Sequence, residues 1–504
     1  MAKPVAAGDA GRLATSALEV IFDDTSAVPA GLRALVGVDR FGELVFQRRS
    51  RLEAMRAAAE AAEASLLHLR DEGDCAALIE RLREAEDDRL FLFCPSHLID
   101  VSGADLITFL RQVRYSPMGL HIPVEGGRDR RGWTLMRGPA LKAFLVKRSD
   151  GDVAGFYDDA GDTLAEVRGR LELIDVSNER TLLDFLSGQF DARHFNSIEH
   201  DDFTVTKRSA DRGKLRREFD FYHLMPPSIQ MFLVQPFDFQ DDGKTASYRM
   251  ERIAIPDMAL QWVHGAFQAE EFERFLKHIF HFVEMRPAKK VSKADSAAVR
   301  QALYVDKVTS RIEELKRLPN YPKLAPLLER ACGGVDTLVE RYLAALAKRI
   351  RRFPSGGLVA GHGDLCFSNI LYSKTNQYLK LIDPRGAAGE QDIYSDPYYD
   401  VAKLSHSILG GYDLINHDKF DIAVDEALGL RLSFETRPPP WARTQFTNSL
   451  DGAGFDPDLT RLCEASLFIS MLPLHMDRPR KVLGFALRAQ MILNELAGER
   501  SGCE

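Results

Sequence analysis

Two aspartates and one asparagine in the C-terminal half of the chain have the types and spacing of a metal-assisted active site. Asp364 follows the apolar segment 358–360, Asn369 comes five residues later, and Asp383 ends the apolar segment 378–382. Both segments have the length of short strands, so a hairpin would bring the three side chains together. Two carboxylates and one amide carbonyl form an all-oxygen ligand set, which Mg²⁺ prefers. The sequence therefore predicts a magnesium site here.

The motifs around these residues are specific. The pattern H-G-D-L-x-x-x-N at 362–369 is followed fourteen residues later by the Asp of I-D-P-R-G, and then by DPYYDVAKL at 396–404. In this order and spacing they resemble the catalytic loop and metal-binding aspartate of the aminoglycoside phosphotransferase and choline kinase group, small-molecule relatives of the protein kinases. The resemblance covers residues 195–495 and implies a two-lobed, α+β kinase-like domain with a helical C-lobe.

The resemblance assigns roles to individual residues. Asp364 would orient the hydroxyl of the substrate and accept its proton. Asn369 and Asp383 would hold Mg²⁺ against the phosphates of ATP, because phosphoryl transfer needs positioning and charge neutralisation more than covalent help. His362 and Asp400 would support the catalytic loop without transferring protons.

A kinase-like lobe with a phosphate-binding lysine must precede this site. Lys207 lies on the alternating segment 203–207, and Glu218 on the helical segment 211–224 is at a suitable distance to pair with it. Lys214 is the competitor for the role of Lys207. A charged helix face is also typical of a solvated surface, which is the alternative for this pair.

The segment before Lys207 contains no glycine, so a glycine-rich phosphate loop is absent from it. Asn196 and Ser197 are candidates to cover the phosphates instead, with a plain hairpin turn as the alternative. Three residues of the segment 247–253 are candidates to present backbone groups to adenine, and an ordinary core strand is the alternative: Met250, Glu251 and Arg252.

Three further residues are candidates for substrate contact. Arg385, two residues after Asp383, would contact a phosphate or an acidic substrate group, or else form a structural ion pair. His475 and Asp477 lie in a predicted loop between two helices. They would line an acceptor pocket, although a turn with a helix-capping aspartate explains them as well.

The elements that position these residues form three regions after a disordered terminus at 1–15. Residues 16–190 are predicted to be an α/β domain, with strands at 18–22, 43–47, 89–94, 143–147 and 171–175 and helices within 51–85, 104–113 and 179–187. Residues 191–255 form the N-lobe, with strands at 203–207, 231–236 and 247–253. Residues 256–504 form the C-lobe, with helices at 269–285, 297–315 and 335–353.

The first domain resembles sugar nucleotidyltransferases in the strand and helix of residues 89–112. Asp23 and Asp24 stand where those enzymes carry a glycine-rich nucleotide loop, so we expect no such activity. The domain would bind an acceptor or a partner enzyme, or support a homo-oligomer. A chain that joins a kinase-like domain to a nucleotidyltransferase-like domain would suit surface-carbohydrate or sugar-nucleotide metabolism.

Composition excludes other classes. The 504 residues carry 66 basic and 74 acidic side chains, a formal net charge of −8, which offers no positive field to a nucleic acid. The six cysteines are spread singly, which favours reduced thiols and a cytoplasmic location. No apolar run reaches the roughly 20 residues that a membrane span needs.

Together these features predict an ATP-dependent, Mg²⁺-requiring phosphotransferase that acts on a hydroxyl of a small molecule, most simply a sugar or polyol. The alternative is a non-catalytic binding or scaffold protein with a kinase-like fold, because the glycine loop is missing. A protein kinase is disfavoured, because no A-P-E-like segment follows Asp383.

Overall fold

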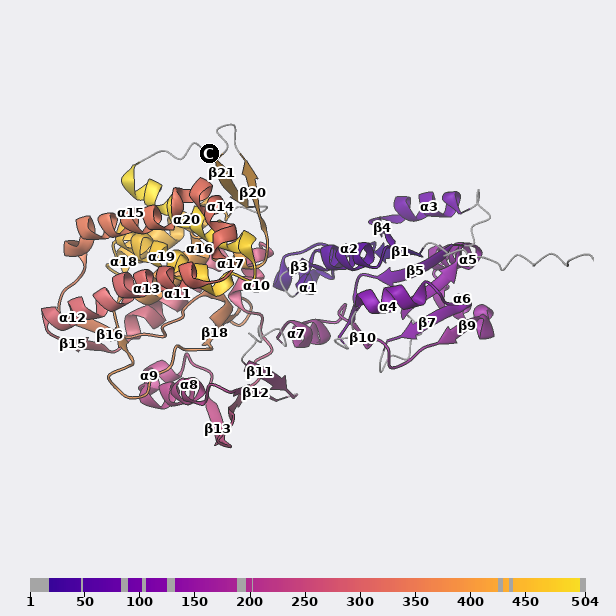
Figure 1. Cartoon of the computed structure of the whole chain (residues 1–504). Coiled ribbons are helices and arrows are strands. Elements are labelled where there is room, and N and C mark those ends of the chain that lie inside the picture. Colours follow the sequence, from indigo (N-terminus) through magenta and orange to yellow (C-terminus); the bar gives the residue numbers. More distant parts are fainter. Residues whose placement is uncertain are drawn as a thin grey trace, which may run out of the picture. The chain divides into compact units, whose positions relative to one another are not determined.

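The computed structural model describes residues 18–46, 49–82, 89–101, 106–124, 132–187, 196–201, 203–424, 429–434 and 438–498 (Figure 1). The predicted terminus 1–15 lies outside them. The chain divides into two compact units. Unit 1 comprises Met1–Arg33 and Val38–Phe185, and unit 2 comprises Ala34–Gly37 and Leu186–Glu504.

Unit 1 is built on a mixed six-stranded sheet. In spatial order its strands are β4 (Ser65–Leu69), β1 (Leu18–Asp23), β5 (Leu90–Pro95), β8 (Gly132–Arg137), β7 (Gly119–Pro123) and β9 (Leu164–Glu166). β1 runs parallel to both β4 and β5, whereas β8 runs antiparallel to β5 and β7. The predicted α/β domain is therefore present as a sheet with helices.

Helices cover both faces of this sheet. Val20 and Phe22 of β1 pack with α2 (Arg51–Ala61) and α4 (Leu106–Val113) on one face. Ile21, between them, packs on the opposite face with α3 (Glu72–Arg81), α5 (Gly138–Ser149) and α6 (Val153–Ala160). Because β1 is buried on both faces, its residues 20–22 form a continuous apolar run. The remaining elements of unit 1 and of its two boundaries with unit 2 are α1 (Ala30–Val36), β2 (Val45–Phe46), β3 (Arg49–Ser50), β6 (Leu98–Asp100), β10 (Leu173–Asp175) and α7 (Glu179–Ser187).

One prediction for unit 1 is wrong. Residues 143–147, predicted as a strand, lie inside α5, which has Pro139 in its first turn. Proline is favourable there because that position needs no amide hydrogen, so the helix starts before the apolar run. The stretch 51–85, predicted to hold one or two helices, holds α2 and α3, and the strand β4 that lies between them was not predicted.

Unit 2 begins with a four-stranded antiparallel sheet in the order β11 (Asn196–His200), β12 (Thr204–Ser209), β14 (Ala246–Glu251) and β13 (Pro236–Asp241). α8 (Arg212–Leu224) follows β12, and the short α9 (Pro227–Gln230) follows α8. Residues 231–236, predicted as a strand, belong to β13 only at Pro236. Leu233 instead makes a single bridge to Leu381.

The rest of unit 2 is mainly helical. Its helices are α10 (Met258–Val263), α11 (Ala269–Met285), α12 (Lys293–Arg300), α13 (Lys307–Arg317), α14 (Tyr321–Cys332), α15 (Gly334–Arg349), α16 (Tyr398–Ile408), α17 (Tyr412–Asn416), α18 (Pro440–Gly452), α19 (Pro457–Met471) and α20 (Pro479–Ala497). A π-helical segment, Gln301–Asp306, joins α12 to α13 without a break.

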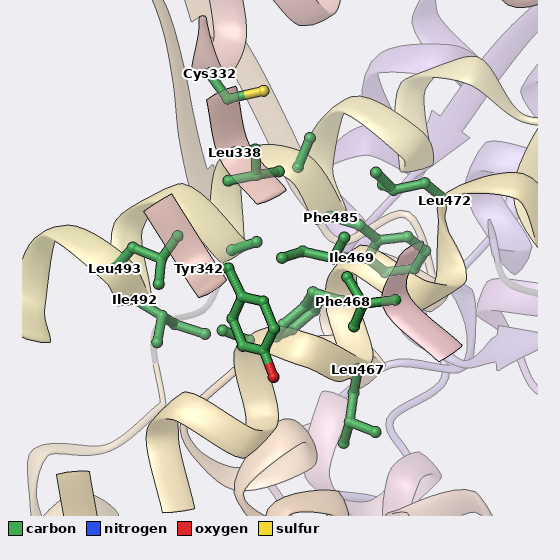
Figure 2. Close-up of a cluster of buried hydrophobic side chains, with 14 of the residues drawn as sticks. Cys332, Leu338, Tyr342, Leu467, Phe468, Ile469, Leu472, Phe485, Ile492 and Leu493 are labelled. Atoms are coloured by element: carbon green, nitrogen blue, oxygen red, sulfur yellow. The ribbon is translucent and has the colours of Figure 1, made fainter. Parts of the chain in front are cut away.

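A large apolar core holds these helices together. Figure 2 shows Tyr342 of α15 among Phe468 of α19 and Phe485 and Ile492 of α20. The five cysteines of the described chain are all buried and free. Within the described residues no helix combines the length and apolarity that crossing a bilayer requires.

Two small sheets position the predicted site. One joins β15 (Ala288–Lys290), β16 (Gly357–Ala360) and β19 (Tyr394–Ser395), and the other is the hairpin of β17 (Ile370–Ser373) and β18 (Tyr378–Leu381). The catalytic-loop motif lies between β16 and β17. A further hairpin, β20 (Phe420–Val424) with β21 (Leu430–Phe434), lies beyond the site in the sequence.

Candidate active site

Lys207 of β12 lies at the centre of a buried ion-pair network. Its Nζ is 2.6 Å from Oε2 of Glu218 on α8 and 2.9 Å from Oδ1 of Asp383. Burial alone would lower the pKa of Lys207, but the carboxylates of Asp383 and Glu218 outweigh it and raise that pKa above its ordinary value. The lysine is therefore a fixed cation that joins the sheet, α8 and the loop after β18.

Lys214, the competing lysine, lies at the exposed edge of this network. Its Nζ is 3.7 Å from Oε1 of Glu218, and half of its side chain is exposed. The buried hydroxyl of Tyr248 on β14 donates to Oε2 of Glu218 at 3.4 Å. The same sheet and helix line a small pocket that reaches Glu218, Tyr248, Met250 and Asp383.

Asp364 and Asn369 are held together within the loop between β16 and β17. The Nδ2 of Asn369 donates to the carbonyl of Asp364 at 2.8 Å and to its Oδ2 at 3.2 Å. The amide of Ile382 donates to the carbonyl of Asn369 at 3.0 Å, which extends the β17–β18 hairpin by one step. Asn369 is thereby tied to the residue directly before Asp383, as the hairpin argument predicts.

Asp400 of α16 binds the backbone of the loop. Its buried carboxylate accepts from the amides of His362 at 2.9 Å and Gly363 at 2.8 Å, and pairs with Arg286 at 3.1 Å. His362 is buried, and burial lowers its pKa, which favours the neutral form of its imidazole. The ring packs edge-on toward Phe221, and the backbone carbonyl of His362 accepts from the amide of Arg385 at 2.9 Å. These contacts suit the supporting roles predicted for both residues.

The loop after β18 has an unusual backbone. Asp383 has a φ of 53°, in the left-handed region that non-glycine residues rarely adopt. Gly363 has a φ of 80°, and a Cβ there would lie 2.6 Å from Cβ of Arg385. Gly363 therefore makes room for the Arg385 side chain directly beside Asp364. Strain of this kind persists where the surrounding structure fixes it, and it clusters at active sites.

Lys403 is a site residue that the sequence analysis missed. Its Nζ lies 2.8 Å from Oδ1 of Asp364, and its side chain is largely buried. The carboxylate of Asp364 outweighs burial and raises the pKa of Lys403. The available signal was the spacing in DPYYDVAKL, because three residues along a helix place Lys403 on the same face as Asp400.

The predicted nucleotide-contacting residues lie along the N-terminal sheet of unit 2. Asn196 and Ser197 pair with Ser209 and Arg208 at one end of β11. Met250 is buried in β14 and Glu251 is exposed at its end. The amide of Arg252 donates to the carbonyl of Phe203 at 2.9 Å, so that amide is not free to bind adenine.

His475 and Asp477 make their observed contacts within the helical region. The ring of His475 packs edge-on to Phe485 at 5.2 Å, and Asp477 is an exposed neighbour of Arg478. Arg478 is the N-cap position of α20 and makes no side-chain cap bond, so the helix-capping role considered for Asp477 is wrong.

The donor set suits a hard divalent cation. Asn369 uses its Nδ2 as a donor toward Asp364, which leaves its amide oxygen available as a ligand. Asp383 offers a carboxylate one residue after Ile382, whose amide is bound to the carbonyl of Asn369. Among the described residues no group of three or more His, Cys, Asp or Glu side chains forms a metal site. A cation here would need further oxygens, which nucleotide phosphates supply in sites of this kind.

No family model and no curated protein sequence matches the chain, but solved structures do. A thermostable mutant of aminoglycoside phosphotransferase APH(4)-Ia, in complex with ADP and hygromycin B, is 10% identical over 64% of this chain and 100% of that chain, with a TM-score of 0.36. A choline/ethanolamine kinase family protein from Mesorhizobium loti is 13% identical over 62% and 91%, with a TM-score of 0.33. An ethanolamine kinase from Plasmodium vivax is 11% identical over 75% and 98%, with a TM-score of 0.34.

These matching structures belong to the group that the motifs of residues 362–386 resemble. With identities and TM-scores this low, the roles of the residues in this chain rest on the contacts described above.

Proposed function

We propose that the chain is a phosphotransferase that moves the γ-phosphoryl group of Mg·ATP to a hydroxyl of a small molecule, most simply a sugar or polyol. The observation that carries the proposal is the meeting of Lys207, Glu218 and Asp383 beside the Asp364–Asn369 pair. An ion-paired strand lysine, a catalytic-loop aspartate and asparagine and a second aspartate are the parts that kinase chemistry uses.

Each residue has a distinct task in the proposed reaction. Asp364 orients the acceptor hydroxyl and takes its proton as the new oxygen–phosphorus bond forms and the bond to ADP breaks. Lys207, held by Glu218, binds the nucleotide phosphates. Asn369 and Asp383 would hold Mg²⁺, which supplies charge neutralisation to the phosphates when bound.

The decisive test replaces the proton acceptor. Asp364→Asn keeps the shape of the side chain but cannot take the proton, so we expect ADP release with a screened acceptor to fall by roughly 10²–10⁴-fold. Binding of Mg·ATP should survive. Asp451→Asn, at an exposed aspartate of α18, is the matched control and should retain full turnover. Near-full turnover by the Asp364→Asn protein would refute the assignment.

The alternative is a kinase-like scaffold without catalysis, motivated by the glycine-free segment before Lys207. Such a protein would not need a buried lysine fixed between two carboxylates. Tight binding of Mg·ATP would favour the phosphotransferase, and its absence would favour the scaffold.

We propose a binding role for unit 1. The carboxyl ends of parallel strands are the usual ligand site of such sheets, and in this chain they are occupied by internal contacts. Asp23 pairs with Arg148 at 3.1 Å, and Asp24 accepts from the amide of Gly42 at 3.0 Å and lies 3.4 Å from His68. These contacts support a nucleotidyltransferase-like domain that binds an acceptor or partner enzyme without transferring nucleotides, in a reducing compartment that suits the free cysteines.

A further inference from the structure

Positive charge gathers around Asp364 on the side of α16 and α13. Lys403 pairs with the Asp364 carboxylate at 2.8 Å. Lys307, the first residue of α13, donates to the hydroxyl of Tyr399 at 2.8 Å and lies over its ring. Arg385 lies against Gly363, directly before Asp364. The two lysines and the arginine come from three separate segments, so their meeting is a property of the fold.

Tyr399 of α16 connects these cations. It is buried, and burial by itself would raise the pKa of its phenol. Lys307, Lys403 and Arg385 outweigh that effect and lower the pKa below its ordinary value. The charged groups that act on this hydroxyl are thus all cations, and Arg385 acts more weakly than the two lysines.

Two of these cations lack an acidic partner. Lys403 is neutralised by Asp364, whereas in the part of the chain that the structure describes neither Lys307 nor Arg385 has a carboxylate within ion-pair distance. Lys307 is half-buried, whereas Arg385 is exposed and can be reached by a ligand. A half-buried cation is normally paired, because removing a charge from water is costly. A half-buried lysine without a carboxylate, together with an accessible arginine on the same side of Asp364, therefore points to an anionic ligand.

Building on the proposed function, we propose that the acceptor is an alcohol that already carries an anionic group, a phosphate or a carboxylate, which Lys307 and Arg385 bind while its hydroxyl faces Asp364. An acceptor with an amino group or quaternary ammonium would meet like charge there. The nucleotide does not need these two cations, since Lys207 and the Mg²⁺ ligands already serve its phosphates.

The test uses four hexoses that differ in charge: glucose, glucosamine, glucuronate and glucose 6-phosphate. Dissociation constants are measured by calorimetry on the full chain loaded with Mg·AMP-PNP, so no turnover is needed. We expect glucuronate or glucose 6-phosphate to bind at least roughly tenfold more tightly than glucose, and glucosamine most weakly. Comparison of the two anions distinguishes carboxylate from phosphate.

Variants locate the anion site. Lys307→Met and Arg385→Met should each weaken binding of the anionic hexose by roughly tenfold and leave the affinity for Mg·AMP-PNP unchanged within about twofold. Lys316→Met, on the same helix as Lys307 but paired with Asp336 at the surface, is the control and should change neither constant.

Three results would overturn the proposal: glucose or glucosamine binding as tightly as the anions, no anion binding to a chain that holds Mg·AMP-PNP, or loss of nucleotide affinity in place of hexose affinity in the two variants. Failure of the wild-type chain to bind Mg·AMP-PNP would instead contradict the proposed function itself, so the two failures are distinguishable.

Discussion

At the scale of single residues, Asp413 on α17 makes stability depend on pH. Its carboxyl group is fully buried, and burial raises its pKa from 3.8 to about 7. The folded chain therefore keeps this proton up to about pH 7, whereas the unfolded chain releases it near pH 4. Between these values the unfolded state binds fewer protons, so the free energy of unfolding falls as pH rises.

Asp413→Asn removes this titration while keeping the size of the side chain. We expect the variant to exceed the wild type in free energy of unfolding by roughly 2–4 kcal/mol at pH 8, with the difference shrinking toward pH 4. Urea unfolding at the two pH values measures it. Asp421→Asn, at an exposed site, is the control, and an equal offset at both pH values for Asp413→Asn would contradict the expectation.

The sequence predicted the site residues that lie near one another in the chain or on consecutive elements. It missed those that come from distant segments. Asp364, Asn369 and Asp383 are joined by one hairpin, and the strand and helix that carry Lys207 and Glu218 are consecutive. Lys403 was visible only as part of a motif, and Lys307 not at all, because its place beside Tyr399 depends on how α13 packs against α16. The reverse error was made for Asp477, where a loop aspartate before a helix is typical of a cap.

At the scale of elements, α16 fixes the catalytic loop through Asp400. Replacing Asp400 by Asn leaves Arg286 as a buried cation without its carboxylate and turns an amide group toward the loop amides. We expect a loss of roughly 3–5 kcal/mol in the free energy of unfolding, because removing one partner of a buried ion pair leaves the other charge buried without compensation.

Denaturant unfolding at neutral pH measures this loss. Asp421→Asn, whose partner Arg480 lies 3.0 Å away at the surface, should cost less than about 1 kcal/mol and serves as the matched comparison. Equal effects of the two substitutions would show that α16 does not carry the loop.

Elements with an amphipathic repeat were predictable. The helix predicted at 269–285 is α11 with the same bounds, since its apolar residues recur at helical spacing. The strand β4 was missed because its short apolar run lies within a stretch of helix-forming residues, and 143–147 was misassigned because a buried helix segment and a buried strand look alike over five residues. In both cases the secondary structure depends on the six-stranded sheet, which β4 joins as a strand and against which α5 packs.

At the scale of the whole molecule, each unit has a hydrophobic core of its own, and all the proposed nucleotide contacts belong to unit 2. A ligand that binds only the folded state stabilises it by RT ln(1 + [L]/Kd). We expect Mg·ATP at about a hundredfold excess over its dissociation constant to stabilise unit 2 by roughly 2.7 kcal/mol.

Calorimetry with and without Mg·ATP checks this, with the transition of unit 1 as the internal reference. Lys207→Met should remove most of the shift, because it removes the cation for the phosphates. The absence of any shift in the wild-type chain would favour the scaffold alternative over the phosphotransferase.

The π-helical segment Gln301–Asp306 makes the phase of one long helix a determinant of the proposed specificity. Before it, Arg300 anchors the helix through Asp396 at 2.8 Å; after it, Lys307 reaches Tyr399. A π-turn holds one residue more than an α-turn, so the same residues wound as a regular α-helix would place Lys307 about 100° further around the axis while the anchor stays in place. The position of the charge beside the acceptor therefore depends on how this segment winds, and a substitution that favours regular α-helical winding there can change substrate preference while every charged side chain is retained.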